Sequence, residues 1–161
     1  MLTRRLLFKC LPWLVLVLAG TPARAQLLDT CTTVTITVSA LSFSYLPASP
    51  AQNSTNVKIS CGLGLFVLPN ITVALTAGNA GSFTPRQMSD GGADRLNYNL
   101  YTTSGYATVW GDGTNGTVTQ NVSGSLIGQA SYTFTAYGLV PAGQYVTATT
   151  YTDEITVQVT F

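Results

Sequence analysis

Tyr151-Thr-Asp-Glu-Ile-Thr-Val-Gln-Val-Thr-Phe161 is the stretch of this chain that decides the fold. Apolar residues alternate strictly with polar ones, so that one face carries Ile155, Val157, Val159 and Phe161. An apolar period of two predicts a β-strand with one buried face. Because the sequence stops on the last apolar residue, we expect this strand to lie in the core and to take its next neighbour from another polypeptide. The same pattern also fits an ordinary strand of a complete sandwich.

Shorter stretches of the same kind, separated by turn residues, occupy most of the remaining chain. They fall at residues 34–38, 57–61, 71–75, 96–101, 117–122 and 132–137, and the first continues after a bend through 41–45. No apolar period of 3.6 residues appears after residue 25. About seven short strands with this spacing predict an all-β, antiparallel β-sandwich.

The first 25 residues have the features of a secretory signal peptide. Arg4, Arg5 and Lys9 precede an apolar run at residues 11–20, and Ala23-Arg-Ala25 offers a small-residue cleavage site. The run is too short to span a membrane. We therefore expect cleavage after Ala25, a secreted protein without a membrane anchor, and one domain over residues 26–161.

Few charged residues remain after such a cleavage. Three basic side chains stand against six acidic ones, a net charge of −3, and no basic cluster exists. Nucleic acid is therefore not an expected partner. The chain also contains no histidine and no paired carboxylates at a telling spacing, so we expect neither an enzyme nor a cofactor.

Two cysteines, Cys31 and Cys61, lie beyond the signal peptide. An even pair in a secreted chain predicts a structural disulfide rather than a catalytic or metal-binding role. Cys31 begins the first predicted strand and Cys61 ends the next, which is consistent with a bridge between adjacent strands.

Five ordered motifs give the chain a family resemblance over nearly all of residues 31–161. It resembles the spore coat protein U domain family, whose members are secreted pilin subunits of the archaic chaperone–usher pathway. Leu139 departs from this pattern, because the family often has arginine there. The motifs are Ser82-Phe-Thr-Pro-Arg-Gln-Met88, Leu96-Asn-Tyr-Asn-Leu-Tyr101, Trp110-Gly-Asp-Gly113, Tyr137-Gly-Leu-Val-Pro-Ala-Gly-Gln144 and the terminal stretch that begins at Tyr151.

This resemblance implies an immunoglobulin-like sandwich that lacks its last strand. In such pilins a periplasmic chaperone lends a strand, and the amino-terminal extension of the next subunit later replaces it. By this resemblance Ile155, Val157, Val159 and Phe161 line the strand-acceptor groove. The implied partners are the chaperone, an outer-membrane usher and other pilin subunits, and the implied role is an extracellular fibre in adhesion and biofilm formation.

The segment between the predicted cleavage site and Cys31 refines this expectation. A donor strand needs about ten residues at roughly 3.3 Å each, whereas residues 26–30 provide only five. We therefore expect a minor, tip-proximal or terminating subunit that accepts a strand without donating a long one. The alternative is a stand-alone secreted β-sandwich that binds a surface or a glycan.

Two other kinds of site have candidate residues. Asp90, Asp94 and the Asp112-Gly-Thr-Asn115 turn could offer oxygen ligands to calcium, although Asp and Asn are also the usual residues of such turns. An aromatic glycan-binding surface has four candidates, although aromatic side chains in a sandwich more often belong to the core. These are Tyr98, Tyr101, Tyr106 and Trp110.

Overall fold

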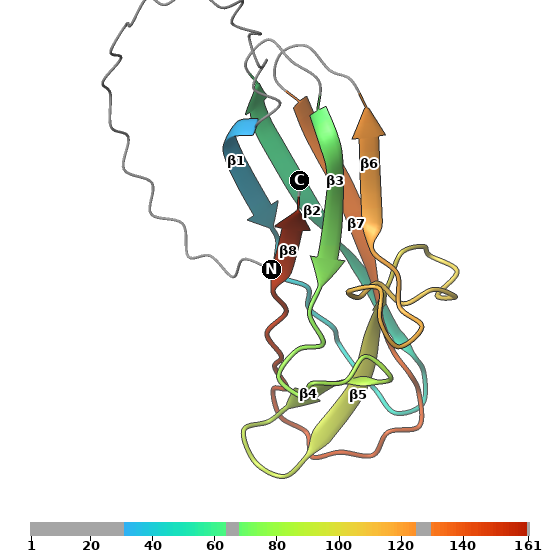
Figure 1. The fold of residues 1–161 in the computed structure, drawn as a ribbon. Helices are drawn as coiled ribbons and strands as arrows, with labels where there is room; N and C mark the ends of the chain where they lie inside the picture. The colour runs from blue at the N-terminus through green and yellow to red at the C-terminus, as the bar shows by residue number, and fades with distance from the viewer. Residues whose placement is uncertain (1–30, 64–67, 125–129, 161) are drawn as a thin grey trace, which may run out of the picture.

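The computed structural model describes residues 31–63, 68–124 and 130–160, and this part of the chain forms two antiparallel β-sheets without a helix (Figure 1). Five strands form one sheet in the order β1-β2-β7-β5-β4, and three form the other in the order β6-β3-β8. The strands are β1 (Cys31–Val38), β2 (Ala51–Leu63), β3 (Leu68–Leu75), β4 (Arg86–Ser89), β5 (Arg95–Tyr101), β6 (Gln120–Gly124), β7 (Ala130–Val140) and β8 (Val157–Thr160).

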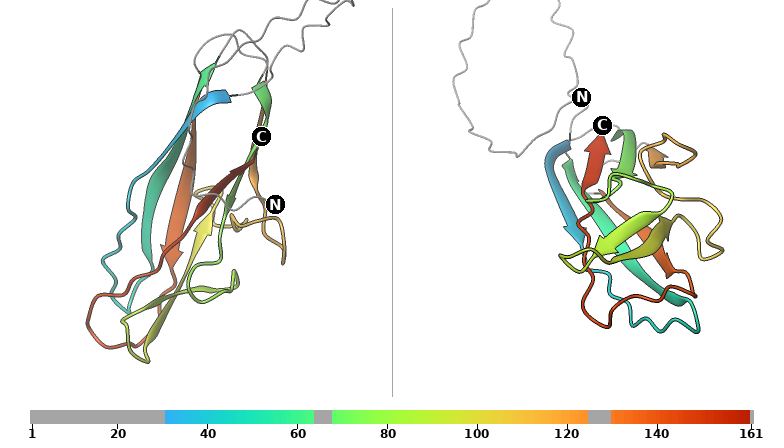
Figure 2. Two further views of the ribbon diagram at one scale, coloured as in Figure 1. Left: turned by 60° about the vertical axis from the view of Figure 1, so that its left-hand side comes forward. Right: turned by 90° about the horizontal axis from the view of Figure 1, so that it is seen from below.

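One apolar core lies between the two sheets (Figure 2). The inward residues of β3 alternate as the sequence predicts, since Ile71, Val73 and Leu75 are buried. Trp110 is fully buried, donates its indole N–H to the carbonyl of Val73 at 3.0 Å, and contacts the Phe134 ring across the core. The predicted all-β, antiparallel fold is therefore confirmed. Within the described ranges no helix is long and apolar enough to cross a membrane.

Two predicted strands differ from the structure in their extent. Residues 41–45 form no ladder, although Leu41, Phe43 and Tyr45 still turn toward the core. The terminal strand is also shorter than residues 151–161, because its pairing with β3 stops where Leu75 faces Val157. Residues 153–155 form no ladder with a described strand, and Thr152 pairs only with Ser89 in an isolated bridge.

Two further differences concern the middle of the chain. The sixth strand runs over Gln120–Gly124 rather than 117–122, because the Gly-rich turn continues past Thr117. Strand β4 was not predicted, since its sequence Arg-Gln-Met-Ser has no apolar alternation. It forms because β5 offers a pairing edge, with Arg86 opposite Tyr98 and Met88 opposite Leu96.

Candidate functional site

An apolar groove lies between the segment that follows β1 and the segment that leads into β8. Its volume is about 300 Å³. One wall consists of residues 38–43 and the other of residues 151–157. Side chains from five strands form the floor, so the groove opens directly onto the core. These floor residues are Val57, Leu75, Met88, Tyr98, Leu100 and Ala136.

Each wall belongs to the edge of a different sheet. Among the described strands, β1 pairs only with β2, and β8 pairs only with β3. Thr156 bonds toward β3, since its carbonyl accepts the Thr76 amide at 3.0 Å and its amide donates to the Thr76 hydroxyl at 2.9 Å. Successive peptide groups of a strand point to opposite sides. The backbone groups of Ile155 and Val157 therefore face the open edge.

The inward face of β1 is unusually exposed for an apolar strand face. Ile36 is 42% exposed and Val38 is 47% exposed, although both alternate with outward threonines in the way that a buried face requires. Contiguous exposed apolar surface commonly marks an interaction site. The groove and this face together present an apolar strip that no described residue covers.

The terminal-strand residues predicted from the sequence lie at this groove. Ile155 and Val157 line it, and both pack with Val159 against the core. Their burial alternates with exposed Glu154, Thr156 and Gln158, as the sequence pattern requires. Phe161, the fourth predicted residue, lies outside the described residues.

Gly138 on β7 allows the wall formed by residues 38–43 to pass close over the sheet. A Cβ atom at this position would overlap the Phe43 ring and the Leu41 side chain. The missing side chain therefore leaves room for residues 41–43 to lie close to β7. Sequence reasoning assigned these residues to a strand but did not identify Gly138 as the position that seats them.

Asp153 fixes the polar end of the groove. Its carboxylate accepts the Tyr98 hydroxyl at 2.7 Å and the amide of Asn79 at 2.7 Å. Burial, together with this bond, raises the pKa of Tyr98 well above its ordinary value, so the phenol remains a proton donor to Asp153. Gly78 packs so closely that a Cβ atom there would overlap the carboxylate. The start of the terminal segment is thereby held against β5 and the 76–81 turn.

Arg86 forms a buried hydrogen-bond centre beside the groove floor. Its guanidinium donates to the carbonyl of Thr76 at 2.8 Å, to the carbonyl of Trp110 at 2.8 Å, and to the side-chain oxygen of Asn99 at 2.7 Å. It also lies 4.9 Å from the centre of the Phe83 ring. Burial lowers the pKa of Arg86, yet an arginine in a protein stays charged. Sequence reasoning recognised the motif that contains Arg86 but assigned it no role.

The loop before the terminal segment is anchored by Asp94. Its carboxylate accepts the hydroxyl of Thr147 at 2.6 Å and the Thr147 amide at 3.1 Å. Hydrogen bonds from Thr147 hold the pKa of Asp94 below its usual value. Asp112 likewise accepts the amide and hydroxyl of Thr114 in its own turn. Among the described residues no three acidic, cysteine or histidine side chains gather to hold a metal ion.

The four aromatic candidates do not form one surface. Trp110 and Tyr98 are buried in the core, whereas Tyr101 and Tyr106 are partly exposed and pack edge to face with ring centres 5.5 Å apart. The structure therefore assigns the first two to packing. This agrees with the usual role of aromatic residues in a sandwich.

The two cysteines belong to neighbouring strands. Cys31 begins β1, Cys61 lies near the end of β2, and these strands pair antiparallel with Val34 opposite Cys61 and Cys31 opposite Leu63. The predicted disulfide stays a prediction. We expect mass analysis of the secreted, non-reduced protein to show Cys31 joined to Cys61, with a stabilisation of about 3–4 kcal/mol from closing a loop of this length. Recovery of two free thiols would contradict it.

Comparison with known proteins places this arrangement in a family. Residues 18–158 match the Spore Coat Protein U domain. A chain in the crystal structure of the CsuC–CsuE chaperone–tip adhesion subunit pre-assembly complex, from the archaic chaperone–usher Csu pili of Acinetobacter baumannii, has a similar fold. That match has 24% identity and a TM-score of 0.52, and it covers 80% of this chain but only 40% of the other. No curated protein matches in sequence. Since the domain match covers most of the sequence, the chain belongs to the Spore Coat Protein U domain family.

Proposed function

We propose that the protein is a subunit of an extracellular fibre assembled by the chaperone–usher pathway, and that its groove accepts a β-strand from another polypeptide. The observation that carries this proposal is the pair of open strand edges beside an apolar groove. In β-strand addition, backbone hydrogen bonds provide affinity and pockets for alternate side chains provide specificity. Here the backbone groups of Ile155 and Val157 supply the bonding edge, and the groove supplies the pockets.

The energetics favour an inserted strand with apolar residues at alternate positions. Burying one large apolar side chain stabilises by about 1.5–3 kcal/mol. Three inward residues would therefore contribute several kcal/mol, and would also cover Ile36 and Val38. A small domain has only about 5–15 kcal/mol of net stability. We infer that the subunit without a donor is marginally stable and prone to aggregate at its open edges.

The proposed occupants follow from the family and the similar solved complex. In that structure a chaperone is joined to a pilus tip subunit before assembly. By analogy, a periplasmic chaperone occupies the groove first. A strand from another pilin subunit then replaces the chaperone at an outer-membrane usher. Adhesion and biofilm formation are the roles that such a fibre would serve.

We further propose that the subunit occupies a minor, tip-proximal or terminating position. The support is the short segment between the predicted cleavage site and β1, which at residues 26–30 is half the length that a donor strand requires. Such a subunit accepts a strand at its groove without supplying one of full length to a neighbour.

The test is fibre formation by the purified mature subunit. We expect the unmodified chain to remain without long fibres, and a graft of about ten residues with alternating valine and threonine before Cys31 to permit them. A matched graft with aspartate at each valine position is the control, because it has the same length but cannot enter an apolar groove. Electron microscopy reports the result. Long fibres from the unmodified chain would contradict the terminating position.

Chaperone capture tests the wider proposal. Co-expression with the cognate chaperone is expected to yield a soluble complex in the periplasm, and expression alone a low yield of aggregated subunit. A stable, monodisperse subunit that does not bind the chaperone would instead support the alternative of a stand-alone binding module.

A further inference from the structure

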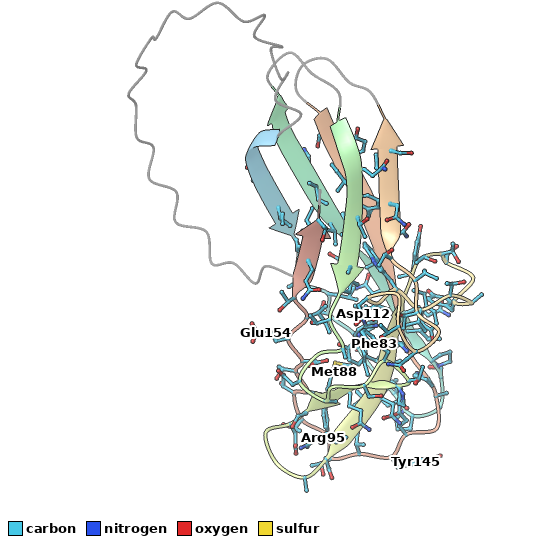
Figure 3. All side chains as sticks on the ribbon, in the orientation of Figure 1. Phe83, Met88, Arg95, Asp112, Tyr145 and Glu154 are labelled. Atoms are coloured by element: carbon cyan, nitrogen blue, oxygen red, sulfur yellow. The ribbon has the colours of Figure 1, made fainter. Side chains whose placement is uncertain are left out.

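Met88 places a thioether at the floor of the groove. It is the only methionine of the chain besides Met1, and therefore the only one beyond the predicted signal peptide. Strand β4 carries it opposite Leu96. The side chain is partly buried against the core, and Figure 3 shows it on the side of the molecule near the segment that carries Glu154.

Met88 lines a mostly apolar groove and is itself only partly buried. It shares the groove with Leu100 and Ala136 on the floor and with Ile155 on the wall. The groove admits water-sized molecules, and a hydroperoxide is little larger. A strand inserted between the walls would cover the same floor. The accessibility of the sulfur is therefore tied to whether the groove is empty.

We propose that Met88 is an oxidation site that controls strand acceptance. A hydroperoxide transfers one oxygen atom to the sulfur lone pair: the S–O bond forms, the O–O bond breaks, and the leaving oxygen takes up a proton to become water or an alcohol. Sulfur is oxidised by two electrons and the peroxide is reduced by two. Methionine sulfoxide reductases can reverse the change.

Oxidation of Met88 makes the floor of the groove more polar, which disfavours insertion of an apolar donor strand. The sulfoxide is polar, and the Tyr98 hydroxyl on the floor is already bonded to Asp153. Of the other hydroxyls that line the groove, that of Thr55 already donates to the Ser39 carbonyl, and Ser39 and Thr152 belong to the walls. An inserted apolar strand would bury this polar group without a partner, which costs free energy. The empty groove is therefore sensitive to peroxide and the filled groove is protected. This inference rests on the strand-acceptor function proposed above.

The first measurement is the rate at which hydrogen peroxide oxidises Met88, monitored by mass analysis of the peptides. The full mature chain is tested alone, with a nine-residue peptide of alternating valine and threonine, and with the same peptide carrying aspartate for valine. We expect the apolar peptide to slow the reaction by at least about tenfold, since access governs methionine oxidation. The aspartate peptide is expected to leave the rate unchanged.

The second measurement is peptide affinity before and after peroxide treatment. We expect oxidation to weaken binding by about tenfold or more, because the groove then contains an unpaired polar group. Met88→Leu removes the sulfur. We therefore expect the affinity of this variant for the peptide to be the same before and after peroxide treatment. This variant also separates the effect of Met88 from that of any other oxidised residue.

The possible failures are distinguishable. If the untreated chain does not bind the apolar peptide, the strand-acceptor function is wrong, and so is its proposed regulation by oxidation of Met88. If the peptide binds but neither protects Met88 nor loses affinity after oxidation, only the inference about Met88 is wrong. Oxidation in the native chain more than about a hundredfold slower than in the urea-unfolded chain would also overturn it, because the sulfur would then be inaccessible.

Discussion

Replacement of Arg86 by methionine is expected to lower the free energy of unfolding by at least about 3 kcal/mol. The change leaves the carbonyls of Thr76 and Trp110 without the side-chain donor they have in the native protein, while the side-chain oxygen of Asn99 keeps only the Leu100 amide. Each unsatisfied buried group costs about 1–3 kcal/mol. Arg86→Lys is expected to recover only part of the loss, because an ammonium group cannot reproduce the planar fork.

The matched control is Arg95→Met. Arg95 is exposed and donates only to the carbonyls of Gly92 and Asp94, so the same substitution is expected to change stability by less than about 1 kcal/mol. Urea unfolding can be followed by the fluorescence of Trp110, the only tryptophan beyond the predicted signal peptide. Equal effects of the two substitutions would show that the Arg86 network contributes little.

Replacement of Val157 by aspartate is expected to abolish strand acceptance. Val157 lines the groove and faces Leu75 in the β3–β8 ladder, so an inserted strand would bury the new carboxylate without a partner. Burial of an unpaired charge costs several kcal/mol, which corresponds to at least about a hundredfold loss of peptide affinity. Chaperone co-purification and the folded yield in the periplasm should both fall.

Gln158→Asp is the control for this change. Gln158 follows directly on the same strand, but its side chain is exposed on the opposite face. The introduced charge therefore stays in water, and we expect an effect below about 1 kcal/mol. Unchanged chaperone binding and yield in the Val157→Asp variant would mean that β8 is an ordinary edge strand and that the strand-acceptor mechanism is wrong for this protein.

Much of the fold could be predicted because burial in a sheet follows a period of two. The alternation in residues 71–75 and 155–159 identified which side chains face the core, and the structure confirms these faces. Alternation does not reveal how far a ladder extends, since pairing needs a neighbouring strand. Residues 41–45 and 151–155 retain the alternation and lack the ladder, and both segments border the groove.

The parts that escaped prediction depend on contacts between distant segments. Arg86 stands in a polar stretch, and its acceptors are Thr76 just after β3, Asn99 within β5, and Trp110. No local pattern predicts that such an arginine is buried. Gly138 likewise looks like an interruption of β7 in the sequence. The structure explains the glycine, because the side chains of Leu41 and Phe43 occupy the space that a Cβ atom would need. The family resemblance suggested the proposed function, whereas the residues that form the floor of the groove could be identified only from the structure.

The two walls of the groove come from opposite ends of the described sequence, residues 38–43 and 151–157. The second wall is held by hydrogen bonds of Asp153 to Asn79 and Tyr98, and the loop before it by those of Asp94 to Thr147. A donor strand, if it binds here as proposed, would therefore require both ends of the domain to be folded. Under the strand-acceptor function proposed above, a truncated or misfolded chain would lack one wall and could not be joined to a neighbour, so assembly would select for folded subunits.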